Sequence, residues 1–286
     1  MRPSRAPGPR SPFSRAVIGQ TIGLLVVVGA GLFYAGYRWG LSRGARQAPA
    51  VTERAHGGSG TKRDAPAPTG DPHLDPRVVT DTTGNFLENP GFEDGSAGWK
   101  WLDWSNDWAP FDIGEGRVAS GTKAAHLAVR GEPGGPPTRV FGLVQELAPT
   151  AFPTRISGRY YVERWAPGTA KKAYTQVVII AMQPRGDLPS MQLRYVLEGV
   201  TEQPYNMSNA RYVFVHRRTQ PELERWIDFA LDVQGDYRRL WGEVPRDGTP
   251  FRVLFEARYD DKPLDGAVTN DVWYDDLFVG LARTSP

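Results

Sequence analysis

The sequence of 286 residues contains no cysteine. This absence excludes disulfide bonds, zinc sites built on thiolates and catalysis by a thiol. Histidine is scarce as well, with four residues scattered along the chain. The sequence also lacks a Gly-x-Ser-x-Gly motif, a His-Glu-x-x-His motif and a phosphate-binding loop. These absences predict that the protein is not an enzyme.

Charge is divided unevenly between two parts of the chain. Residues 1–83 hold 11 Lys and Arg and 5 Asp and Glu, which leaves 23 basic and 27 acidic residues for positions 84–286 out of totals of 34 and 32. The basic isoelectric point of about 8.8 therefore comes from the N-terminal part. Because the remainder is mildly acidic, we expect no nucleic acid partner.

Residues 16–37 carry no charge. At ~1.5 Å per residue they would form a helix of roughly 33 Å, long enough to cross a bilayer core. The run exceeds the apolar region of about 7–15 residues in a cleaved signal peptide, and Arg38, Arg43 and Arg46 follow it. It predicts an uncleaved membrane anchor; the alternative is a signal peptide cleaved near Ala48 or Ala50.

The flanks of this run predict its orientation. The short N-terminal tail, residues 1–15, contains four arginines and no acid. Basic residues favour the cytosolic side, and long C-terminal domains are translocated largely regardless of charge. We therefore expect a single-pass protein of the cytoplasmic (inner) membrane with its N-terminus in the cytosol and its C-terminal domain outside.

Residues 38–83 are rich in Pro, Gly, Ala and Thr and show no apolar periodicity. Such a segment buries too little apolar surface to offset the entropy of ordering it. We expect a disordered stalk that holds the following domain away from the bilayer.

From residue 84 onward, short runs of β-forming residues alternate with turns. Polar and apolar residues alternate within several runs, which indicates half-buried strands. Many short strands with Gly, Pro and Asp turns are typical of a β-sandwich or barrel. We expect strands at residues 124–130, 138–147, 155–165, 174–182, 192–198, 210–217, 225–233, 251–259 and 272–280.

Motifs at the two ends of this region resemble one family. The N-terminal motif is Asn89-Pro90-Gly91-Phe92-Glu93 followed by Gly98-Trp99, and the C-terminal one is Val272-Trp273-Tyr274-Asp275-Asp276-Leu277. Together they resemble the jelly-roll carbohydrate-binding modules with a galactose-binding-like fold. The resemblance implies an all-β jelly-roll β-sandwich over residues 84–286. It further implies non-catalytic binding of a polysaccharide of the cell envelope or the extracellular space.

One part of the chain departs from the family pattern. The stretch from residue 165 to residue 218 is longer and richer in loops than the family would lead us to expect. An extra hairpin there is one explanation. The departure leaves open which strands form the face that binds the ligand.

The resemblance also implies a structural calcium site. Glu93 and the Asp275–Asp276 pair would supply carboxylates, and the turn at Lys123 would add a backbone carbonyl. Calcium takes hard oxygen ligands of this kind, and an ion held from both ends of the domain would tie its termini together. The alternative is that these carboxylates accept hydrogen bonds from loop amides without a metal.

Aromatic residues supply the candidate ligand-binding positions. Trp101, Trp104 and Trp108 lie among Asp and Asn residues of one loop, whereas Trp99 follows Gly98 where the family packs a core residue. Residues 161, 163 and 165 would share one face of an extended strand, which would place Tyr161 and Trp165 on a common platform. The alternative for all these rings is burial in the core or an ordinary solvent-facing side of the sheet.

Two other classes of function stay open. The domain could bind another protein within an envelope complex as a scaffold, or it could be an enzyme of an unrecognised type. Exposed aromatic rings in a groove would favour a sugar ligand, and a flat apolar patch without a groove would favour a protein partner.

Overall fold

The computed structural model describes residues 73–81 and 83–282. The predicted tail at residues 1–15, the predicted membrane span at residues 16–37 and most of the predicted stalk lie outside these ranges. Among the described residues, no helix has the length and apolar character needed to cross a membrane.

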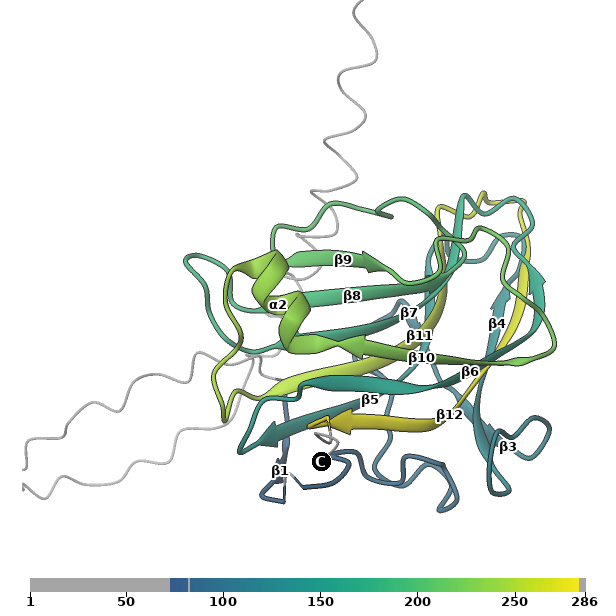
Figure 1. The fold of residues 1–286 in the computed structure, drawn as a ribbon. Coiled ribbons are helices and arrows are strands. Elements are labelled where there is room, and N and C mark those ends of the chain that lie inside the picture. The colour runs from purple at the N-terminus through teal and green to yellow at the C-terminus, as the bar shows by residue number, and fades with distance from the viewer. Residues whose placement is uncertain (1–72, 82, 283–286) are drawn as a thin grey trace, which may run out of the picture. The chain divides into compact units, whose positions relative to one another are not determined.

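The described chain forms two stacked β-sheets (Figure 1). The seven-stranded sheet has the order β1 (Arg77–Val79), β5 (Arg139–Pro149), β11 (Phe251–Asp260), β7 (Lys172–Ala181), β8 (Met191–Glu198) and β9 (Ala210–Phe214), with β2 (Trp108–Ala109) also paired to β5. The five-stranded sheet has the order β10 (Trp226–Asp232), β6 (Arg155–Ala166), β12 (Val268–Gly280), β4 (Ala124–Gly131) and β3 (Asp112–Gly114).

The connectivity is that of a jelly roll. The eight long strands form the rows β4-β12-β6-β10 and β5-β11-β7-β8, so the chain changes sheet at each successive long strand except between β7 and β8. This is the arrangement of a double-sheet jelly roll. The predicted all-β jelly-roll sandwich is therefore confirmed, and each of the nine predicted strands has an observed counterpart.

Alternating side chains of both sheets fill the space between them. Along β11, Phe251, Val253 and Phe255 belong to the main core, together with residues such as Tyr160 and Tyr274 of the five-stranded sheet. Fully burying one such side chain stabilises the fold by roughly 1.5–3 kcal/mol. The other side of β11 is also covered, because the whole strand is buried.

The boundary predicted for the stalk, residues 38–83, is wrong. Strand β1 lies within that range, pairs in parallel with the end of β5 and buries Val79. The strand is held by backbone pairing and has three residues, of which Arg77 and Val78 are exposed. So short a segment carries no detectable hydrophobic alternation.

A helix that we did not predict follows β10. Helix α2 (Val233–Trp241) is capped at its N-terminus by Asp232, whose side chain accepts a hydrogen bond from the Gly235 amide, and at its C-terminus by Gly242, which has a left-handed φ of 77°. Its buried residues are Val233, Tyr237 and Trp241. Their four-residue spacing, between a capping Asp and a terminal Gly, is the sequence signal for this helix.

The stretch between residues 165 and 218 does not contain an extra hairpin, because β7 and β8 belong to the eight jelly-roll strands and only the single strand β9 is added to them. Strands β7 and β8 form an antiparallel hairpin, and β9 adds to β8 in parallel at the edge of the seven-stranded sheet.

Candidate ligand-binding site

A loop at one edge of the sandwich carries the three clustered tryptophans. Its two ends are held to β5: Lys100 and Val144 exchange backbone hydrogen bonds of 3.2 and 2.8 Å, and β2 pairs with β5 at residues 140–141. The chain then crosses to the other layer, where β3 pairs with β4. Residues 96–113 therefore bridge the two sheets from fixed points.

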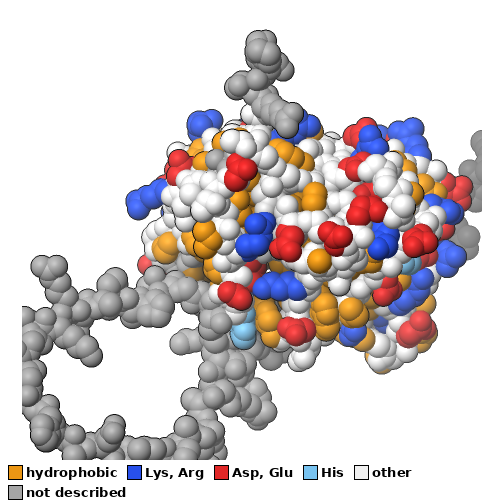
Figure 2. Space-filling view, turned by 90° about the horizontal axis from the view of Figure 1, so that it is seen from below, with side chains coloured by type: hydrophobic (Ala, Val, Ile, Leu, Met, Phe, Trp, Pro, Cys, Tyr) orange, Lys and Arg blue, Asp and Glu red, His pale blue; other side chains and the backbone are white. Residues whose placement is uncertain are grey.

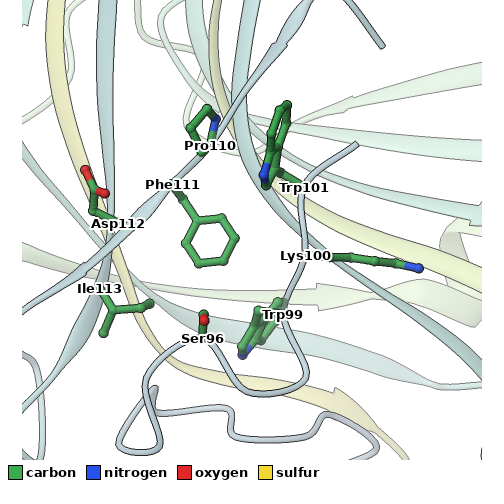
Figure 3. A pocket seen from close by; sticks show the side chains of 8 residues that line it. All are labelled: Ser96, Trp99, Lys100, Trp101, Pro110, Phe111, Asp112 and Ile113. Carbon is green, nitrogen blue, oxygen red and sulfur yellow. The ribbon is translucent and has the colours of Figure 1, made fainter. Parts of the chain in front are cut away.

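This bridging loop borders a half-open hollow of about 360 Å³. Its walls are Ser96, Trp99, Lys100, Trp101, Pro110, Phe111, Asp112 and Ile113. The Phe111 ring lies in the middle of this group, and the Lys100 ammonium points away from it (Figure 3). That ammonium instead pairs with Glu146. The hollow thus combines aromatic walls with a hydroxyl and a carboxylate at its margin.

The three predicted tryptophans of this loop differ in their surroundings. Trp101 is partly exposed and lines the hollow. Trp104 is 42% exposed, and its ring stacks on His73 at a centroid distance of 4.7 Å and an angle of 11°. Trp108 packs against a small apolar cluster around Leu254. Trp104 is therefore the exposed ring of the loop, and Trp101 and Trp108 are both partly exposed; Trp108 also anchors the loop on the outer side of the sheet.

Trp99 belongs to the core, as predicted. It is 6% exposed and contacts Phe92 and Phe255 at centroid distances of 5.3 and 5.9 Å. Its indole N–H donates to the backbone carbonyl of Asn89 at 2.9 Å. This ring forms the inner wall of the hollow and fixes its position.

The predicted common platform of Tyr161 and Trp165 is wrong. The register between β6 and β12 shifts between Asp271 and Val272, so Glu163 is an extra residue in the ladder. A bulge of this kind reverses which side the following residues face. Tyr161 lies on the outer side of the five-stranded sheet, whereas Trp165 packs against the main core.

Tyr161 instead belongs to a row of rings on the outer side of the five-stranded sheet. Trp226, Tyr161, Trp273 and His126 stand directly opposite one another on β10, β6, β12 and β4. The His126 and Trp273 rings stack at 4.1 Å. Gly114, at the end of β3, and Gly116 lie against Trp273, and Tyr161 and Trp273 are buried. The row is thus largely covered by the chain itself.

The four residues predicted to hold calcium meet at one loop. Glu93 accepts hydrogen bonds from the backbone amides of Thr122 and Lys123 at 2.9 and 3.1 Å. The Lys123 ammonium donates to the backbone carbonyl of Glu93 at 2.8 Å. The hydrogen bonds from the Thr122 hydroxyl and from these two amides lower the pKa of the Glu93 carboxyl. On this side, the carboxylate is engaged by the loop itself.

Asp275 holds the same loop from the other side. It accepts from the amides of Ala119 and Ser120 at 2.8 and 3.2 Å, and from the Asp276 amide at 2.7 Å. Burial raises the pKa of the Asp275 carboxyl despite these bonds. The Asp276 carboxylate accepts from the Ser120 hydroxyl and lies 3.3 Å from Arg159.

The donor types at this loop suit calcium, which takes carboxylate and carbonyl oxygens. However, the residues in the described part of the chain include no group of three His, Cys, Asp or Glu placed to hold a metal ion. The oxygens of Glu93 and Asp275 already accept amide hydrogen bonds. Calcium here therefore stays a prediction, beside the metal-free alternative.

Charged side chains of both signs are mixed on the face seen from below in Figure 2, with hydrophobic side chains between them. Neither sign dominates this face. A continuous basic surface would be the electrostatic footprint of a nucleic acid partner, and this face does not provide one.

Six of the eight residues that line the hollow were not singled out from the sequence: Ser96, Lys100, Pro110, Phe111, Asp112 and Ile113. They come from both sides of the tryptophan loop, and the pairing of β2 with β5 and of β3 with β4 brings them together. Strands of two and three residues give no periodic signal. The Pro110-Phe111-Asp112 sequence beside the tryptophans was the only available hint.

No family model and no curated protein matches this chain. Similar solved structures include TmCBM61 in complex with β-1,4-galactotriose, with 12% identity, coverage of 68% of this chain and 97% of that one, and a TM-score of 0.37. A carbohydrate-binding module specific for non-crystalline cellulose, CBM28, has 15% identity, coverage of 72% and 100%, and a TM-score of 0.37.

The enzymatically active domain of tailspike protein 4 of bacteriophage CBA120 is similar over 69% of this chain but only 21% of its own, with 11% identity and a TM-score of 0.39. Such low TM-scores carry no argument about what this chain binds.

Proposed function

We propose that the described domain is a non-catalytic binding module for a polysaccharide of the cell envelope or the extracellular space. The observation that carries the proposal is the hollow between Trp101 and Phe111, with Ser96 and Asp112 at its margin. Ligand sites in proteins are typically concave and mostly apolar, with a few polar groups that fix orientation. A sugar ring has apolar C–H faces and polar hydroxyls, and therefore matches such walls.

Trp104, on the same loop as Trp101, also supports the proposal. It is the only exposed tryptophan among the described residues. The exposed ring leaves apolar surface in contact with water. A bound sugar that covers this surface would gain the free energy of burying it. His73 stacks on one face of this ring, so the imidazole shows how a flat group is accommodated there.

Anchoring and location remain proposals that rest on the sequence. The uncharged run at residues 16–37 would hold the protein in the inner membrane with the domain outside. A reporter fused after Pro286 should be active only outside the cytosol. Activity of that reporter in the cytosol would refute this orientation.

Structural calcium is the other proposal carried over from the sequence. Carboxylates from both ends of the domain converge on residues 119–123, which is the arrangement that such an ion would tie together.

A glycan array probed with the full-length protein tests the proposed binding. We expect a neutral or acidic polysaccharide to bind, and Trp101→Ala to abolish most of the signal. Trp226→Ala is the matched control, because Trp226 is a partly exposed ring on the five-stranded sheet. Absence of any glycan ligand would favour the alternative, a protein-binding scaffold domain.

A further inference from the structure

The start of the described chain lies on the Trp104 ring. The His73 imidazole stacks on this indole at a centroid distance of 4.7 Å and an angle of 11°. His73 is exposed, and β1 begins at Arg77. The segment before β1, residues 73–76, therefore covers part of the ring through which Trp104 would contact the proposed ligand.

A second neighbour of the Trp104 ring decides which of its faces His73 covers. The guanidinium carbon of Arg252 lies 5.9 Å from the ring centroid. Arg252 belongs to β11 and is 4% exposed, so it lies on the sheet beneath the loop. The exposed imidazole of His73 accordingly takes the solvent side of the ring. A flat ligand that stacks on Trp104 from solvent must take the place of this imidazole.

A backbone hydrogen bond ties residues 73–76 to the sheet. The Asp75 amide donates to Oε2 of Glu146 at 3.0 Å. Glu146 is buried and is also paired with Lys100 and Arg252, so its position does not depend on the segment. None of the side chains of residues 73–76 is buried. A segment with so little buried surface can leave Trp104 without opening the core.

Strand β1 gives this segment a fixed end. Its three residues pair with residues 147–149 of β5, and Val79 is buried. Movement can therefore be confined to residues 73–76, and His73 stays near Trp104 after it is displaced. A group tethered so closely competes with a ligand at a high effective concentration.

We propose that His73 is a displaceable cover of Trp104, which competes with the sugar for the same face of the ring. The inference rests on the proposed function and adds the regulation of that site. A ligand that needs the uncovered form has an apparent affinity reduced by the fraction of molecules in which that form is populated. The free energy of one pair of aromatic rings changes such a population about twofold to tenfold.

Calorimetry with the full-length protein and the best glycan from the array tests this competition. His73→Ala should bind the glycan about twofold to tenfold more tightly than the wild type, because the imidazole no longer competes. His73→Trp should bind it more weakly, because a larger ring stacks more strongly on Trp104. Val78→Ala is the control, since this side chain is 69% exposed on β1. Unchanged or weaker binding by His73→Ala would overturn the proposal.

A double variant shows whether the effect acts through Trp104. In the Trp104→Ala background, we expect His73→Ala to leave the affinity unchanged, because no ring remains to be covered. A gain as large as in the wild-type background would also overturn the proposal.

Oxidation by N-bromosuccinimide, a reagent for exposed tryptophan, tests the cover without a glycan. Peptide mass spectrometry should find faster oxidation of Trp104 in His73→Ala than in the wild type, with Trp101 as the reference within each sample. Equal rates at Trp104 would overturn the proposal whatever glycan binds. If Trp104 is oxidised faster but no glycan binds to either protein, the proposed function fails and the cover of Trp104 stands.

Discussion

Glu93 and Asp275 come from opposite ends of the domain and hold the same five-residue loop. Glu93 accepts the amides of Thr122 and Lys123, and Asp275 accepts those of Ala119 and Ser120. The C-terminal strand β12 and the N-terminal segment are thereby fixed to the start of β4. This relationship explains why the two sequence motifs occur together.

Asp275→Ala should lower the free energy of unfolding by at least about 1–3 kcal/mol, because it leaves three backbone amides without an acceptor. Chemical denaturation of the full-length protein measures the loss. Asp228→Ala is the control, because its side chain is 81% exposed on β10. Equal stability of the two variants would show that the loop does not depend on Asp275.

Chelation tests whether calcium assists these hydrogen bonds. If the ion binds, EDTA should lower the melting temperature and added calcium should restore it, since a ligand at a hundredfold excess over its Kd stabilises by roughly 2.7 kcal/mol. If EDTA leaves the melting curve unchanged and elemental analysis finds no metal, hydrogen bonds alone connect the two ends of the domain to this loop.

Glu198 makes the stability of the fold depend on pH. It is fully buried and accepts a hydrogen bond from Tyr160 at 2.7 Å. Burial raises the pKa of its carboxyl, and Tyr160 and Arg218 offset this only in part. The protonated Glu198 carboxyl therefore contributes its full stabilisation below a pH of about 4.3, the pKa of glutamate in the unfolded chain. This stabilisation is lost as pH rises through the higher pKa that Glu198 has in the folded protein.

Removal of this group should remove its pH dependence. We expect the melting temperature of Glu198→Gln to increase relative to that of the wild type as pH rises from 4 toward 8. The comparison with wild type cancels the opposite trend of carboxyls such as Glu146, whose pKa is lowered by Lys100 and Arg252 despite burial. Glu202→Gln, on an exposed loop, is the control. A difference constant with pH would refute the prediction.

Trp165→Ala should destabilise the protein, by less than the roughly 3–5 kcal/mol that truncation of a fully buried aromatic residue costs, because the ring is only partly buried. Its ring packs against the main core near Gly199. Thermal unfolding measures the change, and glycan affinity per folded molecule should stay the same. Weaker affinity with unchanged stability would restore the platform that the sequence predicted.

The strands were predictable because their side chains follow the period of a sheet. The face of Trp165 was not, because a single extra residue at Glu163 reverses the alternation and nothing local marks a bulge. Helix α2 was missed although Val233, Tyr237 and Trp241 have helical spacing. A Gly at position 235 and the preceding strand pattern concealed it.

The site was predictable only in part. Clustering of tryptophans in a polar loop indicated Trp101 and Trp104, which are accessible. The sequence could not distinguish Trp108, which packs on the sheet, from its neighbours. Phe111 joins Trp101 only through strand pairings of two and three residues, which depend on contacts distant in sequence.

The most direct test of the proposed function compares Trp101 and Trp104 with Trp99. We expect Trp101→Ala and Trp104→Ala each to weaken binding of the best array glycan about tenfold, a loss of about 1.4 kcal/mol, with little change in stability. Trp99→Ala should instead cost roughly 3–5 kcal/mol of stability as a core truncation. Calorimetry with full-length protein measures both quantities. Destabilisation by Trp101→Ala and Trp104→Ala, with unchanged affinity per folded molecule, would contradict the proposed binding site.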